Sequence, residues 1–119
     1  MSERPWPVEL RVDPVKSTLT VVFDSGRQFA LAAEYLRVES PSAEVQGHSA
    51  GEKQIVAGKR NVKIAALEPV GNYAVRIRFD DGHDTGLFTW DYLHELGSQY
   101  ESKWQTYLSA LRRNHETRG

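Results

Sequence analysis

Residues Tyr73–Phe79 have the sequence YAVRIRF, and the next five residues, Asp80–Asp84, have the sequence DDGHD. In the first stretch, bulky apolar residues alternate with alanine and arginine, which is the period of a β-strand with one buried face. We expect its odd-numbered residues, Tyr73 included, to face the core. The second stretch begins with Asp-Asp-Gly, which is typical of a tight hairpin whose glycine, Gly82, takes a positive φ angle. Together they predict an antiparallel hairpin that returns as a short strand over residues 87–89.

Similar patterns upstream of this hairpin predict further strands. Apolar and polar residues alternate over residues 8–12 and 62–66, and residues 18–23 are rich in β-branched side chains. The sequence Asp-Ser-Gly at 24–26 then favours a tight turn into a strand over residues 27–31. Because these turns join consecutive strands as hairpins, we expect the strands to pair antiparallel.

Two helices are predicted after the last strand. Residues 90–96 have an apolar face, and Gly97 is expected to end this helix as a C-cap. Ser98 begins a capping box, which predicts a second helix that runs to about Asn114 with one apolar stripe. A shorter helical segment over residues 32–38 stops ahead of Pro41. Strands first and helices last predict an α+β domain, an antiparallel sheet of hairpins with one face covered by the C-terminal helices.

A length of 119 residues fits a single domain, which we assign to residues 8–114. Residues 1–7 contain two prolines and predict a flexible N-terminal arm, and residues 115–119 are expected to fray. Residues 40–60 are polar, contain three glycines and show no period. A loop of that length inside a domain is usually functional or disordered, so it is the first place to look for a binding role.

Composition excludes several kinds of chemistry. The chain has no cysteine, so it cannot form a disulfide, a cysteine zinc site or a thiol nucleophile, and alone it cannot ligate an iron–sulfur cluster. A net charge of -1 provides no basic field for nucleic acid or an anionic membrane. No apolar run approaches the ~18–20 residues of a membrane span, and the first residues are too polar for a signal peptide. We expect a cytoplasmic protein without cofactor, nucleic-acid partner or membrane anchor.

The densest polar cluster lies in the predicted turn after residue 79. Asp81, His83 and Asp84 could bind a divalent metal or perform acid–base catalysis. The alternative is a solvated β-turn, in which Asp and Gly are preferred for backbone reasons. The other three histidines show no i, i+4 pairing that would indicate a metal site.

No other motif indicates catalysis. Residues 51–60 resemble a phosphate-binding loop only superficially, because six residues separate Gly51 from Gly58 where four are required. Arg60 also stands where Ser or Thr would bind magnesium. No serine lies in a Gly-x-Ser-x-Gly elbow. We therefore assign no catalytic residue.

An ordered series of short motifs resembles one known family. The motifs are Leu36-Arg37, Ser40-Pro41-Ser42-Ala43-Glu44, Gly71-x-Tyr73-Ala74-Val75, Asp81-Gly82-His83-Asp84-Thr85-Gly86 and Trp90-x-Tyr92-Leu93. Over residues 8–96 the chain is similar to the gamma-butyrobetaine-hydroxylase-like N-terminal domain family. Members of this family occur as small stand-alone bacterial proteins without an assigned activity. Others are fused to carnitine-pathway 2-oxoglutarate oxygenases or to P-loop iron–sulfur carrier proteins.

The resemblance also implies what this chain has lost. In the hydroxylases, the domain carries zinc held by three cysteines and by the histidine of the Asp-Gly-His motif. The matching positions here are Ser40, Ser42 and Val45, so that only His83 remains. A neutral hydroxyl is a poor zinc ligand and valine is none, so the resemblance implies the fold without zinc or hydroxylation. We expect Ser40 and Ser42 to fold back on His83 and to hold by hydrogen bonds the loop that zinc holds in relatives.

These observations favour a non-enzymatic accessory module that binds another protein. The residues expected to form or support its contact surface are Arg37, Ser40, Ser42, His48, Lys59, Arg60, His83, Asp84 and Trp90. One alternative, implied by the family's fusions, is an accessory factor in iron–sulfur or metal-cofactor handling that docks on a carrier protein. A second alternative is a small enzyme that uses Asp81, His83 and Asp84. The sequence predicts neither the partner's identity nor the oligomeric state.

Overall fold

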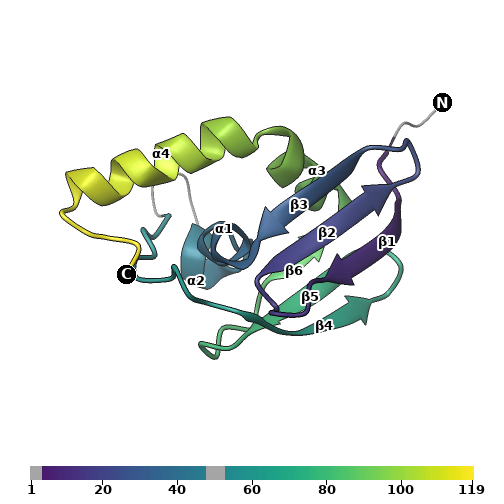
Figure 1. The fold of residues 1–119 in the computed structure, drawn as a ribbon, viewed down its shortest axis with the longest axis horizontal. Coiled ribbons are helices and arrows are strands. Elements are labelled where there is room, and N and C mark those ends of the chain that lie inside the picture. The colour runs from purple at the N-terminus through teal and green to yellow at the C-terminus, as the bar shows by residue number, and fades with distance from the viewer. Residues whose placement is uncertain (1–3, 48–52) are drawn as a thin grey trace.

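The computed structural model describes residues 4–47 and 53–119. The elements in these residues are β1 Pro7–Val12, β2 Thr18–Phe23, β3 Gln28–Ala32, α1 Ala33–Val38, α2 Ala43–Gln46, β4 Ile64–Val70, β5 Ala74–Phe79, β6 Leu87–Thr89, α3 Trp90–Ser98 and α4 Tyr100–Arg113. The strands form two antiparallel three-stranded sheets, β1-β2-β3 and β4-β5-β6 (Figure 1). The predicted α+β class with antiparallel hairpins is confirmed, and the strands divide between two sheets where one was expected.

Strand β5 has the alternation that its sequence predicts. Val75, Ile77 and Phe79 are at most 3 % exposed, whereas the arginines between them face solvent. Gly82 takes a φ of +94°, as the Asp-Asp-Gly turn requires, and the chain returns as β6 alongside the first half of β5. The prediction for Tyr73 is wrong. Because β5 begins one residue later, Tyr73 belongs to the β4–β5 turn and is 52 % exposed.

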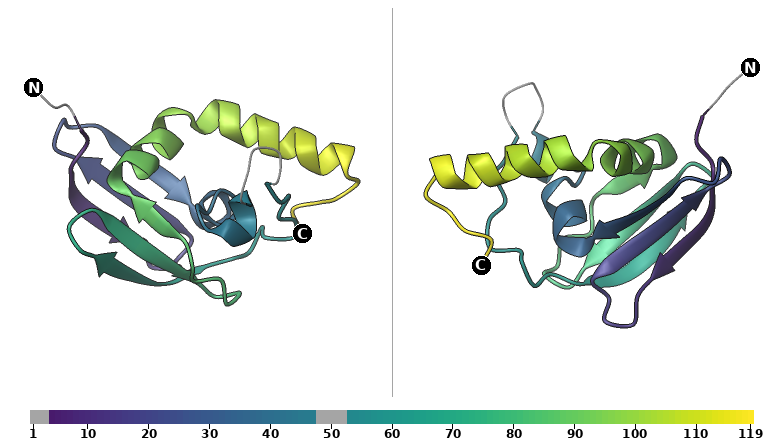
Figure 2. Two further views of the ribbon diagram at one scale, coloured as in Figure 1. Left: turned by 180° about the vertical axis from the view of Figure 1, so that it is seen from behind. Right: turned by 45° about the horizontal axis from the view of Figure 1, so that its top comes forward.

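The two sheets lie against each other (Figure 2). Their buried side chains belong to one apolar core. Its buried side chains come from both sheets and from α1 and α3, and they include Leu19, Val21, Phe23, Leu31, Tyr35, Leu36, Ile64, Val75, Ile77, Phe79, Phe88, Leu93 and Leu96. Helix α3 packs against β3 of one sheet and β6 of the other, and so bridges them. The Tyr35 hydroxyl donates a 2.7 Å hydrogen bond to the backbone oxygen of Leu96, which ties α1 to α3.

Helix α4 runs along the far end of the molecule, above α1 and α2 in Figure 1. Tyr107 and Leu111 on its apolar stripe pack with Val38 of α1 and with residues 55–57. The predicted stripe therefore covers α1 and an irregular segment, while α3 covers the strands. Among the described residues, no helix is both long enough and apolar enough to cross a membrane.

Gly97 lies inside α3, so the prediction that it is a C-cap is wrong. The glycine is required for packing, because a methyl group at this position would collide with the ring of Phe29. Ser98 likewise does not cap α4, and its hydroxyl donates a 2.8 Å hydrogen bond to the backbone oxygen of His94. The two helices are separated at Gln99, shortly after the break at Gly97 and Ser98 that the sequence predicts.

The described part of the N-terminal arm is attached to the first sheet. Strand β1 begins at Pro7, one residue inside the arm that was predicted to be flexible. The backbone oxygen of Trp6 accepts a 2.8 Å hydrogen bond from Asp24 N in the β2–β3 turn. Residues 1–3 of the arm lie outside the described residues.

The tail over residues 115–119 is held in place, so the prediction that it frays is wrong. Its backbone pairs with the segment before β4, where Gly58 N donates to Thr117 O at 2.9 Å. The Arg118 guanidinium donates two hydrogen bonds, of 2.9 and 2.7 Å, to the carboxylate of Glu34, which is buried. Two parallel bonds between a guanidinium and a carboxylate form a strong, directional pair, which explains why the end of the chain is ordered.

The described parts of the expected loop over residues 40–60 contain more structure than predicted. Helix α2 buries Val45, whose backbone oxygen accepts a 2.7 Å hydrogen bond from Gln54 N. The central residues of this loop, His48 among them, lie outside the described residues.

Gly97→Ala is expected to destabilise the protein by about 1–3 kcal/mol, because the added methyl overpacks the contact with Phe29. Helix propensity alone predicts the opposite sign, since Ala favours a helix interior by about 1 kcal/mol over Gly. Chemical denaturation of the variant, with Ser98→Ala as a control expected to change stability by less than about 0.5 kcal/mol, decides between the two effects. A Gly97→Ala protein as stable as the parent would contradict the packing role.

Candidate functional site

A group of polar side chains, the histidine cluster, joins the segment after α1 to the β5–β6 turn. Its members are Ser40, Ser42, Glu44 and His83. The Ser40 Oγ lies 2.9 Å from His83 Nε2, and Ser42 Oγ lies 3.4 Å from the same nitrogen. On the other side of the ring, His83 Nδ1 lies 3.0 Å from Glu44 Oε1. The expected fold-back of Ser40 and Ser42 onto His83 is confirmed.

The surroundings of His83 favour the neutral imidazole. Burial, together with the positive charge of Arg37, lowers its pKa below the ordinary value of 6.5, although Glu44 and Asp81 act in the opposite direction. A carboxylate can only accept a hydrogen bond, so Nδ1 carries the ring proton and donates it to Glu44. Nε2 is then the acceptor, and the Ser40 hydroxyl donates to it.

Asp81 is the centre of a second set of contacts beside this cluster. One carboxylate oxygen accepts hydrogen bonds from Arg37 Nε at 2.8 Å and from Lys59 Nζ at 2.6 Å, and the other accepts from His83 N at 3.1 Å. Burial opposes the ionised form, but the bonds from Lys59, from the backbone of His83 and from Arg37 outweigh it and lower the pKa of Asp81 to about 2. Two predicted contact residues, Arg37 and Lys59, are therefore bound to a carboxylate of the same chain.

The order Ser40, His83, Glu44 matches that of a hydrolase triad, because hydroxyl and carboxylate contact the two ring nitrogens. Burial is distributed the wrong way round for such chemistry. Ser40 is completely buried, while the side chain of Glu44 is 65 % exposed. Gly86 also packs so closely on Ser40 that a methyl group there would collide with Oγ. No substrate carbonyl can approach this hydroxyl, and the cluster acts as a hydrogen-bonded clasp.

Zinc does not fit the same residues. The family resemblance implies zinc ligands at four positions. Two of them, Ser40 and Ser42, offer neutral hydroxyls, and Val45 offers no donor atom. The remaining ligand atom, Nε2 of His83, already accepts from Ser40. Structural zinc is held by four strong ligands, most often thiolates and imidazoles. Within residues 4–47 and 53–119 no group of three or more His, Cys, Asp or Glu side chains could hold a metal ion.

Other predicted site residues lie apart from the cluster. Asp84 borders a shallow depression on the outer side of the β5–β6 turn together with Arg76, Thr85 and Leu87. The backbone of Arg60 donates a 2.7 Å hydrogen bond to Arg118 O, and its side chain forms no ion pair with a described residue. His48 lies outside the described residues. Trp90 follows the opposite end of β6 from His83.

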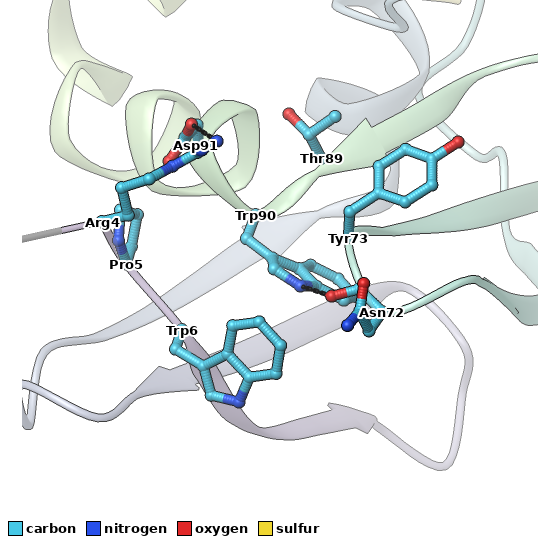
Figure 3. A pocket seen from close by; sticks show the side chains of 8 residues that line it. All are labelled: Arg4, Pro5, Trp6, Asn72, Tyr73, Thr89, Trp90 and Asp91. Atoms are coloured by element: carbon cyan, nitrogen blue, oxygen red, sulfur yellow. Dashed lines mark hydrogen bonds and ion pairs between the residues drawn. The ribbon is translucent and has the colours of Figure 1, made fainter. Parts of the chain in front are cut away.

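Trp90 belongs to a surface pocket of about 240 Å³ (Figure 3). We call it the tryptophan pocket, and its lining residues are Arg4, Pro5, Trp6, Asn72, Tyr73, Thr89, Trp90 and Asp91. They come from three places, the segment before β1, the β4–β5 turn and the β6–α3 junction. The pocket therefore lies where the first sheet's leading segment meets the second sheet.

The walls of the tryptophan pocket are aromatic and its ends are polar. The rings of Trp6 and Trp90 lie in its middle, with Arg4, Pro5 and Asp91 at one end and Asn72 and Tyr73 at the other (Figure 3). The arrangement is anchored by hydrogen bonds to the turn: Trp90 Nε1 donates to Asn72 O at 2.9 Å and Trp90 N donates to Tyr73 O at 3.3 Å. Trp6 is 49 % exposed, so a large apolar surface faces solvent here.

Sequence reasoning identified only Trp90 among these residues. Trp6 was assigned to a flexible arm and Tyr73 to the core, and each assignment removed an aromatic side chain from consideration. The sequence Pro5-Trp6-Pro7 could have indicated a surface site. A tryptophan between two prolines cannot enter a helix or a central strand, so its ring is expected at the surface.

Replacing His83 with glutamine should reduce the pH dependence of stability between pH 7.5 and 5.5. Because the folded-state pKa of His83 is lowered, only the unfolded chain takes up this proton as the pH falls through about 6.5. The parent therefore loses stability towards acid, by at most about 1.4 kcal/mol per pH unit, until the folded-state pKa is reached.

Glutamine can accept from Ser40 but does not titrate, so the His83→Gln protein should lack this component. The free energy of unfolding of both proteins, measured by denaturant titration at several pH values, gives the difference. Parallel curves for the two proteins would mean that His83 is not held neutral in the folded state.

The comparisons with known proteins agree with this architecture. Residues 10–94 match the family model described as gamma-butyrobetaine hydroxylase-like, N-terminal. One NMR solution structure has 47% sequence identity to this chain and a TM-score of 0.83. The match covers 99% of this chain and 88% of the chain in that structure. A second NMR solution structure has 43% sequence identity and also a TM-score of 0.83. The match covers 97% of this chain and 90% of the chain in that structure.

A crystal structure from Acidithiobacillus ferrooxidans ATCC 23270 is 39% identical and has a TM-score of 0.67. It covers 82% of this chain and 98% of its own, and it is described as a protein of unknown function from the DUF971 family. No curated protein matches the chain. The family match spans most of the described strands and α3, and the predicted resemblance is confirmed. The chain belongs to the gamma-butyrobetaine hydroxylase-like N-terminal family.

Proposed function

We propose that the protein is a non-enzymatic cytoplasmic module that binds a protein partner through the tryptophan pocket. The observation that carries this proposal is the exposure of Trp6 and Tyr73 on either side of the anchored Trp90. Exposed aromatic side chains that border one depression are typical of contact sites, where they supply large apolar area at low entropic cost. The three aromatic residues are held by backbone contacts, so the surface is prepared before a partner arrives.

The chemistry of the pocket supports binding over catalysis. The charged groups that line it are Arg4 and Asp91, which form an ion pair at 2.7 Å. It contains no histidine or serine, its one carboxylate is paired with Arg4, and the Thr89 hydroxyl accepts a hydrogen bond from Tyr92 N as the N-cap of α3, so no nucleophile is placed beside a free base. The titratable groups considered for an enzyme, Asp81, His83 and Asp84, all lie outside this pocket. Two of them have partners within the chain, since His83 contacts Ser40 and Asp81 binds two cations.

The proposed contact surface differs from the one expected from sequence. Arg37 and Lys59 bind Asp81, and Ser40, Ser42 and His83 bind one another. In this proposal these residues hold the turn and the segment after α1 in place. Of the contact residues expected from sequence, only Trp90 belongs to the proposed contact surface.

Site-directed photo-crosslinking in cells tests the proposal. With p-benzoylphenylalanine in place of Tyr73, irradiation should give one dominant adduct of defined mass. The same photoreactive residue at Val15, which is at least as exposed as Tyr73 but lies in the β1–β2 turn and does not line the pocket, should not give that adduct. Combining Trp6→Ala with the photoreactive residue at position 73 should weaken the adduct, because one of the aromatic rings that line the pocket is removed. Identical adducts from both positions, or none from position 73, would contradict the proposal.

A further inference from the structure

We propose that the tryptophan pocket binds a proline-containing segment of the partner in the polyproline II conformation. This inference rests on the proposed function, and it names the chemistry of the part of the partner that enters the pocket. Four observations on the pocket carry it: the placement of its rings, its unused hydrogen-bond donors, its charge and its rigidity.

The rings offer the surface that prolyl side chains require. Trp6 and Trp90 lie in the middle of the pocket, and Tyr73 lies at one end (Figure 3). Aromatic-lined grooves of this kind accept the rings of a polyproline II helix, whose side chains project from a narrow, extended backbone. Pro5 at the opposite end adds an apolar contact of the same character.

The donors at the rim match the acceptors that such a segment leaves free. No described residue accepts a hydrogen bond from the indole N–H of Trp6, from the hydroxyl of Tyr73 or from the side-chain amide of Asn72. A polyproline II segment has no internal hydrogen bonds, and its prolines contribute carbonyl acceptors without N–H donors. The indole N–H of Trp6 can only donate, and the Tyr73 hydroxyl and the Asn72 amide can also donate, so these groups are complementary to the free carbonyl groups of this backbone.

The charge of the pocket excludes strongly charged segments as its preferred ligands. Arg4 and Asp91 neutralise each other at 2.7 Å, so the lining has no net charge to attract an acidic or a basic peptide. A neutral, proline-containing segment binds without separating this pair. Its stiffness also reduces the conformational entropy lost on binding.

The β4–β5 turn, which carries Asn72 and Tyr73, holds Trp90 in place. Gly71 takes a φ of +54°, and a methyl group there would come within 3.1 Å of the Tyr73 ring. The glycine lets the ring lie against the turn, while the adjoining backbone oxygens of Asn72 and Tyr73 hold Trp90. The ring of Trp90 is thus positioned by the turn before binding, which favours recognition of a stiff ligand.

Titration of the 119-residue chain with a decaproline peptide, followed by NMR of the indole N–H signals, tests the inference. The signals of Trp6 and Trp90 should shift with saturation. Trp104, which lies on α4 and does not line the pocket, is the internal control and should not shift. A glycine–serine decapeptide of the same length provides the matched control ligand.

Two variants separate ring contact from hydrogen bonding. Trp6→Ala should weaken decaproline binding at least about tenfold, as expected for the loss of an aromatic anchor. Trp6→Phe keeps a ring but removes the donor, and should weaken binding only several-fold. Val15→Ala, at an exposed apolar position outside the pocket, should leave binding unchanged, and the unfolding midpoint of each variant confirms that it is folded.

The outcomes also separate this inference from the proposed function. If decaproline shifts neither Trp6 nor Trp90 while the crosslink from position 73 is obtained, the pocket binds a partner of different chemistry and the inference is overturned. Equal binding of the glycine–serine peptide, or equal shifts at Trp104, would overturn it as well. If the crosslink and the peptide shifts both fail, the proposed function fails with it.

Discussion

The hydrogen bond between Ser40 and His83 joins the segment that follows α1 to the β5–β6 turn. It is formed between a fully buried hydroxyl and an almost fully buried imidazole, so neither group can be satisfied by water if the contact opens. An unsatisfied buried polar group costs about 1–3 kcal/mol, which makes the closed state of this clasp strongly preferred. Glu44 completes the contact by fixing the ring proton on the outer nitrogen.

Closure of the clasp determines which surfaces remain for recognition. His83 is held by Ser40 and Glu44, and its backbone N–H donates to the carboxylate of Asp81. The same carboxylate binds Arg37 and Lys59. The polar groups at this end of β6 are therefore used internally. At the other end of the strand, Trp90 is anchored by the β4–β5 turn and presents its ring to solvent beside Trp6. One short strand thus separates a closed polar site from an open aromatic one.

Local patterns in the sequence were sufficient for the strands, the positive φ of Gly82 and the contact of Ser40 with His83, the last through resemblance to a family in which those positions meet. They were not sufficient where residues distant in the chain decide the outcome. Arg118 pairs with Glu34 and Arg4 pairs with Asp91, across separations of 84 and 87 residues, and no local period reports such contacts.

The tryptophan pocket could not be predicted for the same reason, because its walls come from three separate segments. Gly97 illustrates a different limit. The ring of Phe29, which comes from another element, leaves no room for a side chain at this position, and capping rules wrongly predicted a helix end there.

Long-range ¹H–¹⁵N correlation spectra of the imidazole side chains test the central claim, that a neutral His83 bonded to Ser40 forms this clasp without a metal. At pH 7 the tag-free protein should show His83 with a protonated Nδ1 and an unprotonated Nε2, and one equivalent of zinc should leave both signals in place. A doubly protonated ring, a proton on Nε2 or a zinc-dependent shift of Nε2 would contradict the account.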